Sequence, residues 1–308
     1  MGTGTSHARK KFTTKEKDAN EELTQLLVDS VTYAGFTHLD TAEIYTTEPE
    51  VGNAVKRCDV DRSKLWITSK YNSGWDVPGG KPGKPTVPSG PYEALQKSLE
   101  KLSLSYLDLY LIHFPFFSPE NAEITLEEAW KQMERLVEEG KVRNIGVSNF
   151  NVSKLEEVLK IAKIKPQVNQ IEYNLYLQNQ TPGIVKFCKE KDILVEAYSP
   201  LTPIIPSKIK EGGPLDPLID ELTAKYRVTK SQLILRWVYQ SGVVAVTTSS
   251  SKERLKEYTG MTSFEIEEDD FNKLSEVGST FNFAGFSVIK NLELKFLTHM
   301  DSFLPIMK

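Results

Sequence analysis

The chain has 308 residues, of which 39% are hydrophobic and 26% charged, as expected for a globular protein with a sizeable core. Its net charge of −4 and the absence of a long basic tract argue against nucleic acid and anionic membranes as partners. No apolar run of roughly 18 residues predicts a membrane-spanning helix, and the first residues lack the apolar region of a secretory signal. Only two cysteines occur, Cys58 and Cys188, which favours a reducing compartment. We therefore expect a cytoplasmic protein.

Apolar strand patterns alternate with amphipathic helix patterns along the chain. The expected strands are nearly continuous apolar runs, which is typical of parallel strands buried on both faces. They cover residues 36–40, 65–70, 106–113, 142–150, 166–174, 193–200 and 243–250, and the opening residues 1–5 resemble the end of a further strand. The expected helices cover residues 20–34, 49–57, 91–103, 125–140, 152–162, 181–191, 218–227, 231–241 and 252–260. Residues 74–91, with five Gly and five Pro, are expected to form a long exposed loop.

About eight strand–helix units in about 260 residues fit an eight-stranded (β/α)₈ barrel, that is, a TIM barrel. The main alternative is a doubly wound open sheet. Such a nucleotide-binding sheet would usually carry G-x-G-x-x-G after its first strand, and no stretch of this chain fits that pattern. No linker divides the chain into two domains, so the sequence predicts a single barrel.

Polar side chains follow the expected strands where each one ends. In a barrel these ends surround one mouth, the usual place for catalytic residues. Taken singly, each has an ordinary structural explanation: a hydrogen-bonded Asp–Tyr pair, a surface lysine, a wall histidine. It is their joint occurrence that predicts a site. The residues are Asp40, Tyr45, Lys70, His113, Ser148, Asn149, Gln170 and Tyr198.

Four of these residues suit proton donation. An ammonium of Lys70 beside Tyr45 would lower the pKa of the phenol from about 10 toward neutrality. Asp40 would pair with Lys70 and fix its position. Tyr45 could then protonate a substrate oxygen, which a neutral His113 would orient. No nucleophile motif and no metal-ligand spacing such as HExxH or CxxC occurs, so we expect carbonyl reduction with a hydride from a bound cofactor.

Six stretches of the chain resemble the aldo-keto reductases: GFTHLDTAEIY, LWITSK, LDLYLIHFP, GKVRNIGVSNF, QVNQIEYN and LVEAYSPL. Four further stretches are most similar to the fungal branch of α-keto amide and conjugated polyketone reductases: GTGT, LIHFPFF, NLYLQNQTPGIVKFC and VTTSSS. The resemblance implies a monomeric (β/α)₈ barrel over residues 1–278 that uses NADPH without metal or flavin. It also implies a catalytic tetrad of Asp40, Tyr45, Lys70 and His113.

The resemblance further implies the cofactor contacts. Ser148, Asn149 and Gln170 match the positions that bind the nicotinamide carboxamide, and Tyr198 matches the tyrosine that stacks on the ring. The loop over the pyrophosphate would include Ser199 and Leu201, and Thr5 would also contact the cofactor. The 2′-phosphate is expected near the start of the helix after residue 250, a typical anion site, although one serine there would also serve as a helix cap. Those residues are Ser249, Ser250, Lys252 and Arg254, and Thr248 stands where many members have Lys.

The ends of the chain depart from the family pattern. Members usually begin with a β-hairpin before GTGT that plugs the barrel, whereas this chain starts on that motif, so the hairpin is either absent or outside the given sequence. Its loss would expose apolar barrel residues. Residues 279–308 do not resemble the family's ending and are expected to be a divergent segment, not a domain. Phe281, Phe283 and Phe286 could shape the substrate pocket or pack outside the barrel.

The expected function is reduction of small activated ketones and aldehydes: α-keto amides, α-keto esters or lactones, and α-diketones. Its pocket is expected to include Phe114, Tyr71, Trp75 and Tyr173, because aromatic walls suit a small, moderately polar ligand. One alternative is an NADPH-binding sensor or regulatory subunit with little turnover. Another is a lyase or aldolase that uses Lys70 as a Schiff-base nucleophile, which needs a neutral lysine and conflicts with a pairing to Asp40.

Overall fold

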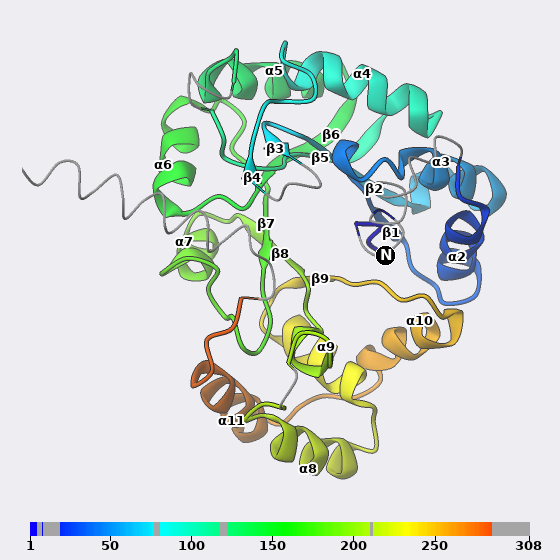
Figure 1. Cartoon of the computed structure of the whole chain (residues 1–308), viewed down its shortest axis with the longest axis vertical. Coiled ribbons are helices and arrows are strands. Elements are labelled where there is room, and N and C mark those ends of the chain that lie inside the picture. Colours follow the sequence, from blue (N-terminus) through cyan, green and yellow to red (C-terminus); the bar gives the residue numbers. More distant parts are fainter. Residues whose placement is uncertain (5–7, 9–18, 77–80, 118–121, 210–211, 285–308) are drawn as a thin grey trace, which may run out of the picture.

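The computed structural model describes residues 1–4, 8, 19–76, 81–117, 122–209 and 212–284. Its centre is a parallel sheet of seven strands in the order β1-β2-β5-β6-β7-β8-β9, and helices surround this sheet (Figure 1). Each neighbouring pair runs parallel, as expected from alternating strands and helices. The strands are β1 (His38–Asp40), β2 (Trp66–Tyr71), β5 (Leu107–Ile112), β6 (Val142–Ser148), β7 (Val168–Glu172), β8 (Leu194–Tyr198) and β9 (Val244–Val246).

Residues 1–3 lie between the two outer strands of this sheet. Gly2 forms an isolated parallel bridge with Asp40, and its backbone N–H donates to the carbonyl oxygen of Thr247 just after β9 (2.9 Å). The sheet is thus nearly closed into a barrel. The expected eighth strand is not formed in the described residues, because this segment pairs with β1 through one bridge only, whereas a strand consists of consecutive bridges.

Ten α-helices occur in the described part of the chain. They are α2 (Glu21–Thr32), α3 (Glu48–Arg57), α4 (Pro91–Leu102), α5 (Leu126–Glu138), α6 (Val152–Ile161), α7 (Ile184–Glu190), α8 (Asp216–Tyr226), α9 (Lys230–Gln240), α10 (Lys252–Thr259) and α11 (Glu268–Ser279). Thr125 and Thr229 begin α5 and α9 with capping boxes, in which a Glu or Gln three residues later bonds back to the cap. Helix α11 was not among the expected helices.

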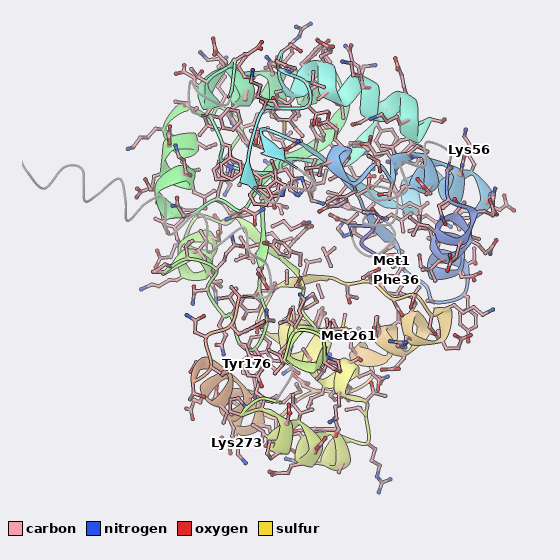
Figure 2. The ribbon with its side chains drawn as sticks, in the orientation of Figure 1. Met1, Phe36, Lys56, Tyr176, Met261 and Lys273 are labelled. Carbon is pink, nitrogen blue, oxygen red and sulfur yellow. The ribbon has the colours of Figure 1, made fainter. Side chains whose placement is uncertain are left out.

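The space between sheet and helices is filled by one large apolar cluster. It includes the fully buried Trp130 of α5 and Trp237 of α9. Figure 2 shows side chains filling the space inside the helices, with Met1 among them. In the described residues no helix combines the length and apolar character that crossing a bilayer requires.

The Gly- and Pro-rich segment 74–91 differs from the expected exposed loop. It contains a short antiparallel pair, β3 (Trp75–Asp76) with β4 (Lys81–Pro82). Trp75 and Val87 are buried. Apolar side chains in this segment therefore fold back onto the barrel, which the Gly and Pro content concealed.

The described start of the C-terminal segment packs on the barrel near the β7–α7 connection. Phe281 meets Tyr176 edge-to-face, with ring centroids 4.9 Å apart, and stacks on Phe283. The backbone N–H of Phe283 donates to the carbonyl oxygen of Tyr176 (3.2 Å). Phe286 lies outside the described residues.

Candidate active site

The four residues expected to transfer a proton lie together at one end of the sheet. Asp40 is the last residue of β1, Lys70 is the penultimate residue of β2, and His113 directly follows β5. Tyr45 ends the 3₁₀-helix η1 (Glu43–Tyr45), which follows β1 closely. Since the carboxyl ends of parallel strands meet at one edge, strand order alone brings these side chains together.

A buried ion pair forms the base of this group. The ammonium of Lys70 donates to Oδ1 of Asp40 (2.7 Å) and to the carbonyl oxygen of Thr41 (2.9 Å). Lys70 is fully buried. A buried ammonium needs such partners, because its desolvation is otherwise too costly. The pairing that the sequence predicted for Asp40 and Lys70 is present.

Tyr45 and His113 meet above this pair. The hydroxyl of Tyr45 lies 3.4 Å from Nε2 of His113, and the two rings meet edge-to-face. Burial, followed by the positive charge of Lys70, holds the pKa of His113 well below its ordinary value. His113 is therefore neutral, as expected. Its Nδ1 has no hydrogen-bond partner within the described residues.

The expected lowering of the Tyr45 pKa is wrong for this structure. Burial and then the negative charge of Asp40 raise that pKa above its ordinary value. Lys70 lies 5.3 Å from the centroid of the Tyr45 ring, and its charge is compensated by the carboxylate that it contacts. Tyr45 is consequently protonated at neutral pH and able to donate a proton, although it is a weaker acid than predicted.

The residues expected to bind the nicotinamide carboxamide form one hydrogen-bonded network. Asn149, with a left-handed backbone (φ 63°), donates from Nδ2 to the carbonyl oxygen of His113 (3.0 Å) and to Oγ of Ser148 (3.1 Å). The Tyr198 hydroxyl donates to Oδ1 of Asn149 (2.9 Å), and Ser148 donates to the Gln170 carbonyl oxygen (2.7 Å). The structure therefore brings all four residues together beside His113.

Gln170 also connects this network to the ion pair. Its Nε2 donates to Oδ2 of Asp40 (2.9 Å) and to Oε2 of Glu196 on β8 (2.8 Å). Sequence reasoning missed Glu196. The available signal was a single carboxylate inside the apolar run ILVEAY, where a charge needs a buried partner.

Three stacked aromatic rings border the group. Trp75 lies nearly parallel to Phe114 (centroids 5.2 Å apart) and to Phe116 (5.9 Å). Phe114 also stacks on His113 (4.2 Å), and Tyr45 packs against the same apolar cluster. Phe116 was not predicted, although the run HFPFF after β5 was a visible signal. We call Trp75, Phe114 and Phe116 the aromatic wall.

Two other residues expected in the pocket lie elsewhere. Tyr71 is fully buried in the main core, and its hydroxyl donates to the carbonyl oxygen of Val87 (3.1 Å). Tyr173 stacks on Trp237 of α9, with centroids 5.3 Å apart. Successive residues of a barrel strand point alternately to the barrel interior and to the helix layer. Tyr71 ends β2, Tyr173 directly follows β7, and both side chains belong to the main apolar cluster.

The residues expected at the phosphates lie around the start of α10. Ser251 is the N-cap, and its Oγ accepts from the backbone N–H of Arg254 (3.3 Å). Ser249 is buried and its Oγ accepts from the N–H of Ser251, whereas Ser250 is exposed. Lys252 and Arg254 are exposed in the first turn, so two cations lie at a helix N-terminus.

The remaining expected cofactor contacts follow β8 or precede α2. Ser199 has a left-handed backbone (φ 56°), and the buried Leu201 begins the 3₁₀-helix η3 (Thr202–Ile204). These two residues place the loop after β8 beside Tyr198. Thr5 lies outside the described residues.

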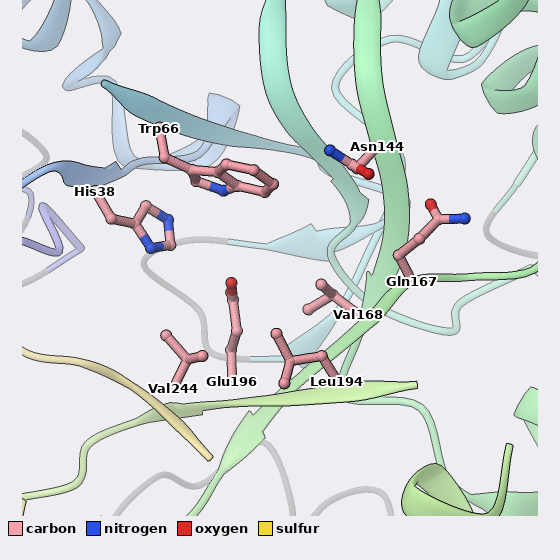
Figure 3. A pocket seen from close by; sticks show the side chains of 8 residues that line it. All are labelled: His38, Trp66, Asn144, Gln167, Val168, Leu194, Glu196 and Val244. Atoms are coloured by element: carbon pink, nitrogen blue, oxygen red, sulfur yellow. The ribbon is translucent and has the colours of Figure 1, made fainter. Parts of the chain in front are cut away.

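A cavity of about 370 Å³ lies at the opposite end of the sheet. The first residues of five strands line it, together with Asn144, Gln167 and Glu196; those first residues are His38, Trp66, Val168, Leu194 and Val244. Glu196 points from β8 into this cavity, with His38 and Trp66 beyond it (Figure 3). Oxygen and nitrogen atoms of His38, Asp40 and Glu196 lie within 4.8 Å of one another. Lys70 and Gln170 each donate to one carboxylate oxygen of Asp40, so both oxygens already accept hydrogen bonds.

Comparison with known proteins agrees with this arrangement. The model of the Aldo/keto reductase family matches residues 1–279. The chain is 42% identical over 283 residues to an NADPH-dependent alpha-keto amide reductase of Saccharomyces cerevisiae, which covers 90% of this chain and 86% of that protein. It is 38% identical to an NAD/NADP-dependent indole-3-acetaldehyde reductase of Schizosaccharomyces pombe, over 92% of both chains.

A solved structure shares the fold. The Bombyx mori aldo-keto reductase in complex with NADP superposes with a TM-score of 0.76 at 29% identity, covering 94% of this chain and 92% of that one. The expected resemblance is thereby confirmed over nearly the whole described barrel. The chain belongs to the aldo/keto reductase family.

Proposed function

We propose that this protein is an NADPH-dependent carbonyl reductase that converts small activated ketones and aldehydes to alcohols. One observation carries the proposal: a protonated Tyr45 lies against a neutral His113, above the buried Lys70–Asp40 pair. This arrangement holds a proton donor and supplies no nucleophile. A Schiff-base lysine is disfavoured, because Asp40 and Thr41 hold the ammonium of Lys70.

The residues present fit NADPH at both of its ends. Amides and a hydroxyl beside His113, from Asn149, Gln170 and Ser148, match a carboxamide, which both donates and accepts hydrogen bonds. At the other end, Lys252, Arg254 and the N-terminus of α10 match a phosphate. When bound, NADPH supplies the hydride.

The side chains of the site orient the substrate and supply the proton. His113, neutral and fixed by stacking on Phe114, orients the carbonyl oxygen of the substrate. Tyr45 donates its hydroxyl proton to that oxygen as the carbonyl is reduced. Lys70 lies beneath Tyr45 and stabilises the phenolate left behind, and Asp40 keeps Lys70 charged and in place.

The substrate class follows from the aromatic wall. Its parallel rings border Tyr45 and His113, so they suit a flat, moderately apolar group next to the carbonyl. α-Keto amides, α-keto esters or lactones, and α-diketones have such planar, conjugated carbonyls. The names of two relatives, an alpha-keto amide reductase and a Glyoxal reductase of Bacillus subtilis, support this choice.

The test is NADPH oxidation, followed by its absorbance, with an α-keto amide, an α-keto ester and an α-diketone. We expect wild type to reduce them and Tyr45→Phe to lose roughly 10²- to 10⁴-fold in kcat, as is typical of a removed general acid. Tyr71→Phe is the matched control, because that hydroxyl bonds Val87 in the core. Undiminished turnover in Tyr45→Phe, or cofactor binding with no turnover of any carbonyl, would overturn the proposal.

We also infer the wider setting. Residues 1–3 stand at the position of an eighth strand, which supports a (β/α)₈ barrel over residues 1–278 with 279–308 as an appended segment. Both cysteines are free and buried, which suits the reducing cytoplasm. The family resemblance supports a monomer that needs only the cofactor and a small carbonyl as partners.

A further inference from the structure

Glu196 lies between the candidate active site and the cavity at the other end of the sheet. Its side chain points into that cavity (Figure 3), and it is 3% exposed. It neither contacts Tyr45 nor lies at the carboxyl end of a strand. Its described link to the reacting groups runs through Gln170, whose amide donates to Oε2 of Glu196 and to Oδ2 of Asp40.

The hydrogen bonds of Gln170 fix the direction of its amide. A side-chain amide nitrogen has two hydrogens, and here each one meets a different carboxylate. The reverse orientation would place a carbonyl oxygen against two carboxylates, which repels. Glu196 and Asp40 together therefore hold the amide nitrogen of Gln170 toward the two carboxylates. The carbonyl oxygen of the same amide stays available to other donors.

The same bonds restrain Asp40. One carboxylate oxygen accepts from Lys70 and the other accepts from Gln170. Without the second bond the carboxylate could rotate, and Lys70 would lose its fixed place below Tyr45. The four residues thus form one chain of hydrogen bonds in the order Glu196, Gln170, Asp40 and Lys70.

We propose that Glu196 is a positioning residue, which through Gln170 fixes the Asp40 carboxylate and thereby the ammonium of Lys70. The proposal rests on the function proposed above. It assigns the carboxylate of β8 a part in the reduction, although that carboxylate touches neither cofactor nor substrate.

The charge of Glu196 adds a dependence on pH. Burial, followed by the negative charge of Asp40, raises the pKa of Glu196 to about 7. The charged and titratable groups that face it are Asp40 and His38 from β1, Lys70 from β2, and the amino group of Met1. As pH rises through about 7, Glu196 gains a negative charge three hydrogen bonds from Lys70. That charge opposes release of the Tyr45 proton, so reduction slows.

Two substitutions separate the hydrogen bond from the charge. Glu196→Gln keeps an oxygen that accepts from Gln170 and removes the charge, so kcat should stay near the wild-type value at low pH and lose the inflection near neutrality. Glu196→Leu removes both the acceptor and the charge, so kcat should fall roughly tenfold at low pH, about the effect of one lost hydrogen bond, and should also lose the inflection near neutrality. Both variants should leave the KM of the ketone within about twofold, since Glu196 lies away from the aromatic wall.

Val195→Ala is the control, because Val195 precedes Glu196 on β8 and packs in the main core. It should keep the inflection near neutrality. The measurement is kcat and KM with NADPH and an α-diketone from mildly acidic to mildly basic pH, with thermal melts to confirm folding. Wild-type rates and wild-type pH profiles in both Glu196 variants would overturn the inference.

A crystal structure of Glu196→Leu supplies a readout that needs no turnover. We expect the Gln170 amide to turn away from Asp40, and the Lys70–Asp40 contact to lengthen or disorder. Unchanged positions of Gln170, Asp40 and Lys70 would contradict the positioning role even if no carbonyl is reduced. Failure of the proposed function shows separately, as a wild-type protein that turns over none of the carbonyls.

Discussion

Asp40 is the anion that makes a fully buried lysine possible in this site. Replacing it by Asn keeps an oxygen that can accept from Lys70 but removes the charge that balances the ammonium. Removal of one partner from a buried ion pair commonly costs about 3 kcal/mol of unfolding free energy. We expect Asp40→Asn to lose about that much in chemical denaturation, together with roughly tenfold or more in kcat.

Asp269→Asn provides the comparison for Asp40→Asn, because Asp269 is exposed in the first turn of α11. It should change the free energy of unfolding by no more than about 0.5 kcal/mol. If the two variants lose equal free energy of unfolding, the Lys70–Asp40 pair does not stabilise the folded protein as described.

Glu43 makes stability depend on pH. Burial raises the pKa of Glu43 from its ordinary value of 4.5 to about 7. Between those two values the folded state binds more protons than the unfolded state, so the free energy of unfolding falls as pH rises through that window. The contribution of Glu43 to the free energy of unfolding is constant below about pH 4.5 and above about pH 7. The whole fall is at most about 3 kcal/mol, at about 1.36 kcal/mol per pKa unit.

Glu43→Gln should remove this contribution. The Gln oxygen can still accept from the backbone N–H of Asn72, as Glu43 does now (3.0 Å). We expect the variant to gain stability relative to wild type as pH rises through that window, measured by urea denaturation at each pH. Exposed Glu22→Gln is the control and should follow the wild-type curve. Parallel curves for wild type and Glu43→Gln would contradict the raised pKa.

Helix α10 is the element that we expect to distinguish NADPH from NADH. Its first turn presents Arg254 and Lys252, so two cations lie at the positive end of the helix dipole. Arg254→Ala should raise the Michaelis constant for NADPH about tenfold, because one charge-assisted contact to the 2′-phosphate is lost. The constant for NADH should not change.

Lys256→Ala is the matched control for Arg254→Ala, since Lys256 is exposed in the last turn of the same helix. It removes the same charge two residues further along the helix, about 200° around its axis, and should leave both Michaelis constants within about twofold. An unchanged constant for NADPH in Arg254→Ala would exclude this helix end as the phosphate site.

Strand positions were predictable from the sequence, because a buried parallel strand is a continuous apolar run with a polar end. That pattern placed Asp40, Lys70 and His113 at one end of the sheet. It could not predict the charge balance of the site. The expected lowering of the Tyr45 pKa is wrong, because burial raises this pKa and the carboxylate of Asp40 compensates the charge of Lys70. The pattern also could not reveal that Gln170 is the partner of Glu196, since a hydrogen bond across neighbouring strands depends on register, which the sequence of one strand does not contain.

At the scale of the whole molecule, closure of the sheet is the feature that sequence patterns described least well. Seven apolar runs gave seven strands, whereas residues 1–3 contribute a single bridge and a few backbone hydrogen bonds to their neighbours. So short a segment has no periodicity to detect. Helix α11 was missed for another reason: its acidic first turn and the few buried residues along it weaken the apolar pattern.

The two ends of the proposed cofactor site belong to different elements of the barrel. Gln170 lies on β7, whereas Arg254 lies on α10, which follows β9, and β8 separates these two strands in the sheet. A ligand that contacts both connects elements that are far apart in the sequence. NADPH should therefore stabilise the molecule as a whole, by about 2.7 kcal/mol at a concentration of about 100 times Kd.

A thermal melt measures this stabilisation. We expect saturating NADPH to raise Tm by roughly 5 °C, from that free energy and the usual shift per kcal/mol for a domain of this size. NADH at equal concentration should raise Tm less, because it lacks the phosphate that α10 is expected to hold. Tyr45→Phe should keep the full shift, since its hydroxyl serves the substrate and not the cofactor. A Tm that is the same with and without NADPH would contradict cofactor binding, and with it the hydride source that the arrangement of Tyr45, His113, Lys70 and Asp40 requires.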